Sequence, residues 1–466
     1  MKLKRDLSYF DLTNIVIGAI VGSDIYIASA ITAGLIGPFS IIVWIVAGIL
    51  ATVLAMVFAY SSYYVPKVGG SFAFVSAAFD DFYGFLTGWS MWIAEVLALP
   101  VFAITFTNYL QYFIHLDFLQ QILVKAIFIF GLTWINIVGV RAAGKFNDIL
   151  TLVKLSPLLL LIIVGLASFV NTPSTFASNY SPLAPIGLDN FGTALVLIFW
   201  AYVGFELGTL PASEVKNPKK TIPKGIITGM IIVILFYLLT NFVIYGTIDW
   251  TNLSNSTTPL LLVGSALLGT FGAILMSSGA LVSVSGSDES DVLGTSRLSY
   301  AMSIDGLFPK IFSKIHPTYR TPYMALIIQG IIAFVVSIFT GVTQLISFSV
   351  FNLAFSFLFV CLALIVLRKG KRKDLHGQNI LALAGVGICL YLLYSTTAFD
   401  KIAGTTLILL GIPIYLFFSP KVDIHHLKRL FLSEEAIFTR RLEKKERFLA
   451  NFVRLLHRFY KNANKF

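Results

Sequence analysis

Long apolar runs separated by short polar segments recur along the whole chain. Each run has about the 20 residues that an α-helix needs to cross a bilayer. None shows the alternation over about 10 residues that is typical of a membrane β-strand. We interpret residues 259–269 as an outer helix or re-entrant piece before the eighth run. Twelve spans are predicted, at residues 12–35, 40–64, 83–112, 122–140, 147–169, 189–211, 223–246, 270–297, 322–341, 344–367, 378–396 and 402–419.

The first predicted span is interrupted. It contains Gly18 and Gly22, and it would hold Asp24 at membrane depth. Glycine costs about 1 kcal/mol inside a helix, and a buried unpaired acid costs more. Irregular backbone persists in hydrocarbon only where it lines a cavity. The stretch from Gly18 to Tyr26 is therefore predicted to form half of a substrate site.

The sixth predicted span repeats this pattern. Val203-Gly204-Phe205-Glu206 matches Val21-Gly22-Ser23-Asp24 as Val-Gly-x-acid, five spans later. Glycine-interrupted helices at corresponding places in two halves point to an inverted-repeat transporter with a midplane site. The helix half after a break offers N–H groups to anions, and the half before it offers C=O groups to cations. Such a pair of breaks suits a zwitterion such as an amino acid.

Composition supports an all-α polytopic membrane protein. The chain of 466 residues is 57% hydrophobic and 12% charged, whereas soluble domains are about 25% charged. No cleavable signal peptide is expected, because the first apolar run is long and no small-residue cleavage site follows it. Cys361 and Cys389 both lie in apolar runs, and the six histidines lie in loops or the tail. We expect no metal site and no cofactor other than a coupling ion.

The basic residues predict the topology. All but three of the 34 lysines and arginines fall in segments that face the cytoplasm if the chain starts inside, as the positive-inside rule requires. Lys125 and Lys401 fall outside, and Lys154 lies within the fifth span. Both termini of this multi-pass protein are therefore expected in the cytoplasm, at the plasma membrane. The net charge of +11 reflects this topology, and no nucleic-acid partner is expected.

The tail, residues 420–466, is strongly basic. Its segment from Phe448 to Tyr460 has apolar residues at helical spacing and a basic face. We predict an amphipathic helix lying on anionic lipid; the alternative is a solvated basic tail that only enforces topology.

Three motifs in order resemble those of the amino acid–polyamine–organocation transporter superfamily. The first, Gly18 to Tyr26, is similar to the family's Gly-x-Ile-Ile/Val-Gly-Ser-Gly-Ile-Phe. The second is Glu214-Val215-Lys216-Asn217-Pro218, and the third runs from Arg297 to Pro309, followed by His316-Pro317 and Thr321-Pro322. The resemblance covers spans one to ten. It implies alternating access and a LeuT-like five-plus-five inverted repeat, with helices 1 and 6 broken and two extra helices.

The implied organisation divides the chain into five parts. They are a cytoplasmic N-terminus (1–11), a first repeat (12–169), a second repeat (189–367), two further helices (378–419) and the tail (420–466). The resemblance places substrate between the two breaks. The expected substrate-binding residues are Ile20, Val21, Gly22, Ser23, Asp24, Trp200, Ala201, Tyr202, Val203 and Gly204; the expected coupling or gating residues are Lys154, Glu95, Glu206, Ser283, Ser287 and Asp288.

Lys154 has two interpretations. In proton-coupled relatives, a fifth-span lysine occupies the place where sodium-coupled relatives hold a sodium ion between spans one and eight, and Lys154 matches that placement. A lysine desolvated at membrane depth can exchange its proton near neutral pH. The alternative is a structural lysine permanently paired with an acid.

Six acids lie within predicted spans and away from the loops, where such residues are costly and usually functional: Asp24, Glu95, Glu206, Asp288, Glu289 and Asp291. Asp24 replaces a glycine of the family motif and would repel a carboxylate. Three interpretations follow. The acids bind a cationic substrate, they form a proton or sodium pathway, or they pair with Lys154 or line a wet vestibule.

We expect a secondary transporter of amino acids or related organic amines, coupled to protons or, alternatively, to sodium. A polyamine or cationic-amine transporter or exchanger, with Asp24 binding the amine, is the first alternative. A transport-inactive sensor or a channel on the same fold is the second. An enzyme is not expected, because no histidine lies in a span and no cofactor motif is present. The substrate and the choice between uptake and exchange stay open.

Overall fold

A computed structural model describes residues 8–66, 69–139, 143–209, 215–368 and 377–418. Every regular element within these ranges is helical. Nine stretches in the described part are long and apolar enough to cross a membrane, and three shorter apolar helices accompany them. The protein is therefore a helical, multi-pass membrane protein, as the apolar runs predict. Helices lie at all of the predicted apolar segments.

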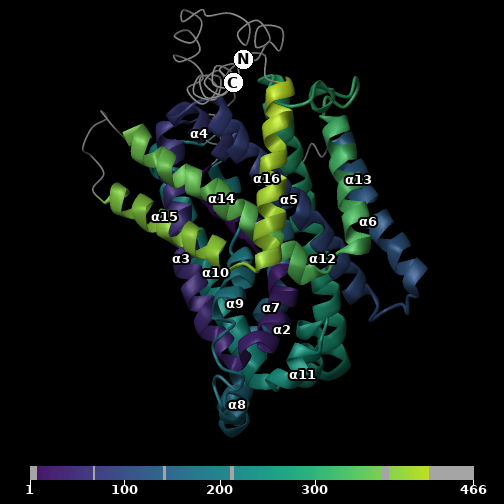
Figure 1. The fold of residues 1–466 in the computed structure, drawn as a ribbon. Helices are drawn as coiled ribbons and strands as arrows, with labels where there is room; N and C mark the ends of the chain where they lie inside the picture. The colour runs from purple at the N-terminus through teal and green to yellow at the C-terminus, as the bar shows by residue number, and fades with distance from the viewer. Residues whose placement is uncertain (1–7, 67–68, 140–142, 210–214, 369–376, 419–466) are drawn as a thin grey trace, which may run out of the picture.

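The helices follow one another with short connections (Figure 1). In chain order they are α1 (Tyr9–Ile20), α2 (Asp24–Ile36), η1 (Gly37–Phe39), α3 (Ser40–Tyr64), α4 (Gly70–Ala78), α5 (Asp81–Leu110), α6 (Phe118–Val138), α7 (Ala143–Asn171), α8 (Pro173–Asn179), α9 (Phe191–Trp200), η2 (Phe205–Thr209), α10 (Pro218–Thr247), α11 (Trp250–Ser254), α12 (Pro259–Ile304), η3 (Lys310–Ser313), α13 (Tyr323–Phe339), α14 (Val342–Arg368), α15 (Gln378–Ser395) and α16 (Ala398–Phe418).

Local sequence explains where several helices start. Ser8 and Asp11 form a capping box at the start of α1, and Asp117 and Gln120 form another at the start of α6. Asp80 accepts hydrogen bonds from two backbone N–H groups at the start of α5. Each of these side chains satisfies donors that have no partner within the helix.

The bundle is built around α5, which packs along both α12 and α14, while α1 packs along α10 and α3 along α9 and α10. In Figure 1, α6 and α13 lie on one side of the bundle and α15 on the other. The short helices α8 and α11 lie at the end opposite α4 (Figure 1). This separation agrees with the charge-based topology, which places α8 and α11 outside and α4 at the cytoplasmic side.

Helix α12 is 46 residues long and is kinked at Gly269, whose φ of 61° and ψ of −147° are not helical. The kink separates the first ten residues of α12 from the part that contains the eighth predicted span. The sequence indicates the same division, because residues 259–269 are interpreted as an outer piece before that span. The predicted tail helix, part of the predicted N-terminus and Glu214 of the second motif lie outside the described residues.

Candidate functional site

The first predicted span is broken, as its glycines indicate. Helix α1 ends at Ile20 and α2 starts at Asp24, with Val21, Gly22 and Ser23 between them. The backbone N–H of Gly22 donates to Oδ1 of Asp24 at 2.9 Å. The hydroxyl of Tyr237 in α10 donates to Oδ2 of the same carboxylate. Asp24 is 4% exposed, so a buried acid is held by a backbone donor inside the break and a side-chain donor from another helix.

The second break lies between α9 and η2 and is built the same way. The N–H of Gly204 donates to Oε2 of Glu206 at 3.1 Å, so the glycine and the acid two residues later again form a closed hydrogen bond. Gly204 has a φ of +117°, and a Cβ at this position would lie 2.9 Å from the carbonyl oxygen of Ala19. The two breaks therefore touch, and glycine is needed at 204 both for its conformation and for this close approach.

Lys154 joins the first break to α12. Its Nζ donates to the carbonyl oxygen of Gly18 at 2.5 Å and to Oγ of Ser287 at 3.2 Å. Ser287 in turn donates to the carbonyl of Val21 at 2.9 Å. Lys154 is 2% exposed and interacts electrostatically with Asp24. Its ammonium thus lies among neutral oxygens of α1 and α12, which are the kind of ligands that otherwise coordinate a cation at an unwound helix.

Gly22 is needed where α12 passes the first break. A Cβ at this position would lie 3.0 Å from Cβ of Ser287 and 3.1 Å from Oδ1 of Asp24. The absence of a side chain allows α12 to approach the broken backbone closely.

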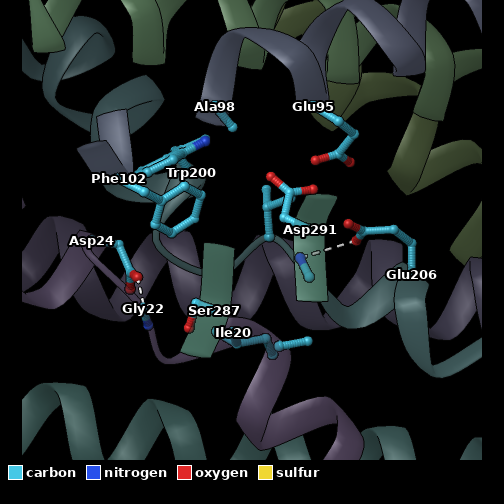
Figure 2. Close-up of a pocket in the computed structure, with 13 residues that line it drawn as sticks. Ile20, Gly22, Asp24, Glu95, Ala98, Phe102, Trp200, Glu206, Ser287 and Asp291 are labelled. Carbon is cyan, nitrogen blue, oxygen red and sulfur yellow. Dashed lines mark hydrogen bonds between the residues drawn. The ribbon is translucent and has the colours of Figure 1, made fainter. Parts of the chain in front are cut away.

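A cavity lies between the two breaks, α5 and α12 (Figure 2). Nine predicted site residues line it: Ile20, Gly22, Asp24, Trp200, Val203, Gly204, Glu95, Glu206 and Ser287. Four further residues complete the lining: Ala19, Ala98, Phe102 and Asp291. The structure therefore brings residues of spans one, three, six and eight to one place.

The acids of the cavity form two separate groups. Figure 2 shows the carboxyl groups of Glu95, Glu206 and Asp291 gathered on one side, with Asp24 on the other side of Ser287. Glu95 and Asp291 lie within hydrogen-bonding reach of one another, and Asp291 also interacts electrostatically with Glu206. We call Glu95, Glu206 and Asp291 the acid cluster. They come from α5, η2 and α12 respectively.

Seven predicted residues are not among those lining the cavity: Val21, Ser23, Ala201, Tyr202, Lys154, Ser283 and Asp288. Tyr202 faces α3, where its hydroxyl donates to the carbonyl of Trp44 at 3.0 Å. Lys154 lies beside the first break, one layer away from the cavity. Ser283 and Asp288 are buried in α12, and Oγ of Ser283 and Oδ1 of Asp288 accept no hydrogen bond from the residues the structure describes.

Several residues at the site are not among the site residues expected from the sequence: Ala98, Phe102, Asp291 and Tyr237. Ala98 and Phe102 follow Glu95 at helical spacing on α5, so the helical period would have placed them beside Glu95. Asp291 follows Ser287 by four residues in α12, which gives the same signal. Tyr237 carries no signal of this kind, because nothing in the sequence distinguishes it from the other tyrosines of the spans.

Comparison with known proteins agrees with this architecture. A family described as amino acid permease matches residues 7–423. The chain is 28% identical over 445 residues to a methylthioribose transporter of Bacillus subtilis (strain 168), covering 90% of this chain and 94% of the relative. It is 27% identical over 443 residues to the branched-chain amino acid permease BcaP of the same organism, with the same coverage. It is 28% identical over 442 residues to the human cystine/glutamate transporter, covering 90% of this chain and 86% of the relative.

The match extends over nearly the whole chain and includes both helix breaks, α5 and α12. The family and these relatives are transporters and not enzymes. This chain therefore belongs to the amino acid permease family and is a membrane transport protein.

Proposed function

We propose that the protein is a proton-coupled secondary transporter of amino acids or related organic amines. The proposal of proton coupling rests on the position of Lys154. Its ammonium donates hydrogen bonds to the carbonyl oxygen of Gly18 and to Oγ of Ser287. When Lys154 is charged, it holds α7, the first break and α12 together. When it is neutral, its interaction with Asp24 weakens, so that a proton gained or lost at Lys154 favours one arrangement of these helices over another.

Several broader features support transport by alternating access. We propose twelve spans arranged as a five-plus-five inverted repeat with two further helices, in the plasma membrane, with both termini cytoplasmic. The paired breaks at Gly22 and Gly204 support the repeat, because each closes on its own acid in the same way. The location of α8 and α11 opposite α4 supports the orientation (Figure 1).

Substrates named for the relatives define the first uptake panel. Leucine, glutamate, cystine and methylthioribose represent them, and arginine, agmatine, putrescine and spermidine add cationic compounds. Purified protein in proteoliposomes should take up at least one compound faster when an inward proton gradient is imposed. Binding without uptake of any compound would instead favour a transport-inactive sensor.

The role of Lys154 is tested by Lys154→Ala. The expected result is uptake that no longer responds to the proton gradient while exchange between equal pools persists. Lys125→Ala is a matched control. Lys125 lies in α6 and donates to the carbonyl of Ser337 in α13, so its hydrogen bond involves neither break. Its gradient response should equal that of the wild type. An unchanged response in Lys154→Ala would remove Lys154 from coupling.

Orientation is tested by labelling single cysteines with a membrane-impermeant thiol reagent. The native Cys361 and Cys389 are buried, so they are expected to give little background. Ser174→Cys in α8 should react from outside intact cells, and Thr318→Cys, between η3 and α13, should react only after permeabilisation. The opposite pattern would invert the proposed topology.

A further inference from the structure

The backbone N–H group of the glycine in each break is already occupied. At an unwound helix, free N–H groups and the positive end of the following helix are suited to an anion. Here the N–H of Gly22 bonds to Asp24 at 2.9 Å, and the N–H of Gly204 bonds to Glu206 at 3.1 Å. The chain therefore supplies its own carboxylate at each place where an amino acid would present its carboxylate.

Asp24 is also poorly placed to bind a ligand amine. One of its oxygens accepts from Gly22 and the other from Tyr237, and Lys154 contributes a compensating charge. A carboxylate with a donor on each oxygen and a lysine nearby has little need of a further cation. The ammonium of a ligand is thus better accommodated elsewhere in the cavity.

Unlike Asp24, the acid cluster has carboxyl groups whose charge no residue lining the cavity compensates. No lysine, arginine or histidine is among the residues that line the cavity. Oε1 of Glu95 is buried and receives no hydrogen bond from the described residues. Asp291 receives one from Thr295 at 3.2 Å, and Glu206 receives the Gly204 N–H. Carboxyl groups that lie this close repel one another unless a proton or another cation lies among them.

Aromatic side chains face the same cavity. Trp200 and Phe102 line it with ring centroids 6.1 Å apart; in Figure 2 they lie on the side of Asp24, across the cavity from Glu95 and Glu206. Trp200 is 7% exposed, and the faces of both rings attract organic cations.

Metal binding is a weaker explanation of the cluster. The described residues contain no group of histidine, cysteine, aspartate and glutamate side chains arranged to hold a metal ion. A wall of two aromatic rings next to carboxyl groups fits an ammonium on a carbon chain better than a bare metal ion.

We propose that the cavity binds an organic amine that lacks a carboxylate, with its ammonium at the acid cluster and its carbon chain against Trp200 and Phe102. This inference rests on the proposed transport function and narrows its substrate class. The amine replaces the missing positive charge at the cluster, while the two breaks keep their own carboxylates.

Matched pairs of an amino acid and its decarboxylation product test the proposal directly. The pairs are arginine and agmatine, ornithine and putrescine, and leucine and 3-methylbutylamine. Equilibrium binding to the full-length protein in nanodiscs should be at least about tenfold tighter for each amine that binds, because the parent's carboxylate would compete with Asp24 and Glu206 for the glycine N–H groups of the breaks. Tighter binding of the amino acids would overturn the proposal.

Substitutions in the acid cluster and in the first break separate the roles of the two places. Glu95→Gln should weaken amine binding by about tenfold or more, and Asp291→Asn serves the same purpose if the first variant does not fold. Asp24→Gly frees the Gly22 N–H, so it should gain affinity for the amino acid of a pair relative to the amine. Amine binding that neither cluster variant changes would overturn the proposal. It would also be overturned if the carboxyl groups of the acid cluster bind protons but the protein binds none of the amines.

Uptake by the same preparation distinguishes this inference from the proposed function. Uptake of amino acids with no preference for amines would leave the transport function standing and refute the inference. Tight amine binding without uptake of any compound would refute transport and leave the binding site standing.

Discussion

Gly204→Ala is the substitution that should most sharply disrupt the contact between the two breaks. Gly204 has a φ of +117°, and an added Cβ would lie 2.9 Å from O and 3.0 Å from C of Ala19, and 3.2 Å from N of Ile20. All three atoms belong to the backbone, so no side-chain rotation can relieve the overlap. The breaks must move apart, or the backbone at 204 must change conformation.

The cost of this substitution has two parts. A non-glycine residue held at such a φ costs about 1–3 kcal/mol, and overpacking a well-packed site costs about 1–3 kcal/mol. We therefore expect a loss of about 2–6 kcal/mol in stability. With an unfolding entropy of about 2.1 cal/mol/K per residue, a chain of this size loses about 1 °C in melting temperature per kcal/mol. The expected shift is about 2–6 °C, together with loss of ligand binding.

Two glycines provide matched controls that separate the conformational cost of Gly204→Ala from its overpacking cost. Gly187 also has a positive φ, of +77°, but a Cβ there would meet nothing within 4 Å. Gly131 lies within α6 and likewise has open space around it. Gly187→Ala should show only the conformational cost, and Gly131→Ala should be neutral or slightly stabilising, since alanine favours helix. The assay is thermal unfolding in detergent followed by intrinsic fluorescence, with ligand binding measured alongside. Wild-type stability and binding in Gly204→Ala would refute the idea that the breaks must touch.

Three other substitutions test single contacts. Tyr237→Phe removes the hydroxyl that donates to Asp24 and should cost about 1–3 kcal/mol of stability. In an Asp24→Asn background this loss should be smaller. An equal loss in both backgrounds would show that Tyr237 and Asp24 are not energetically coupled. Ser287→Ala removes the hydroxyl that accepts from Lys154 and should weaken the response of uptake to a proton gradient, so a wild-type gradient response would contradict the proposed link. Asp117→Ala removes the cap of α6. It should cost about 1 kcal/mol of stability and lower the melting temperature, while uptake stays unchanged. Reduced uptake at an equal amount of protein would contradict a purely structural role for Asp117.

The helical segments and both breaks could be predicted from the sequence because each depends on local composition. Apolar runs define spans by length alone, and a glycine two residues before an acid in an apolar run indicates a break. Lys154 stands out for the same reason, as the one basic residue that lies well away from the ends of a predicted span. Its contact with Gly18 and Ser287 follows the placement that the family resemblance implies.

The orientation of side chains within the site could not be predicted in the same way. Tyr202 lies beside the break in sequence, yet its hydroxyl bonds to Trp44, because a break changes the direction of the residues before it. Tyr237 reaches Asp24 from a helix more than 200 residues away in sequence. The closure of Asp24 onto Gly22 depends on the backbone geometry of the break, which composition does not specify.

Because each break carries its own carboxylate, Gly22 and Gly204 keep their hydrogen bonds after a ligand leaves. A carrier whose breaks rely on the ligand for these bonds exposes unsatisfied donors when empty, at about 1–3 kcal/mol each when buried. Such a carrier returns slowly without cargo and behaves as an obligatory exchanger. In the proposed transport cycle, the empty carrier would retain those partners, so its return step would have no such barrier. We therefore expect the built-in carboxylates to favour net movement of substrate down its driving gradient over strict one-for-one exchange.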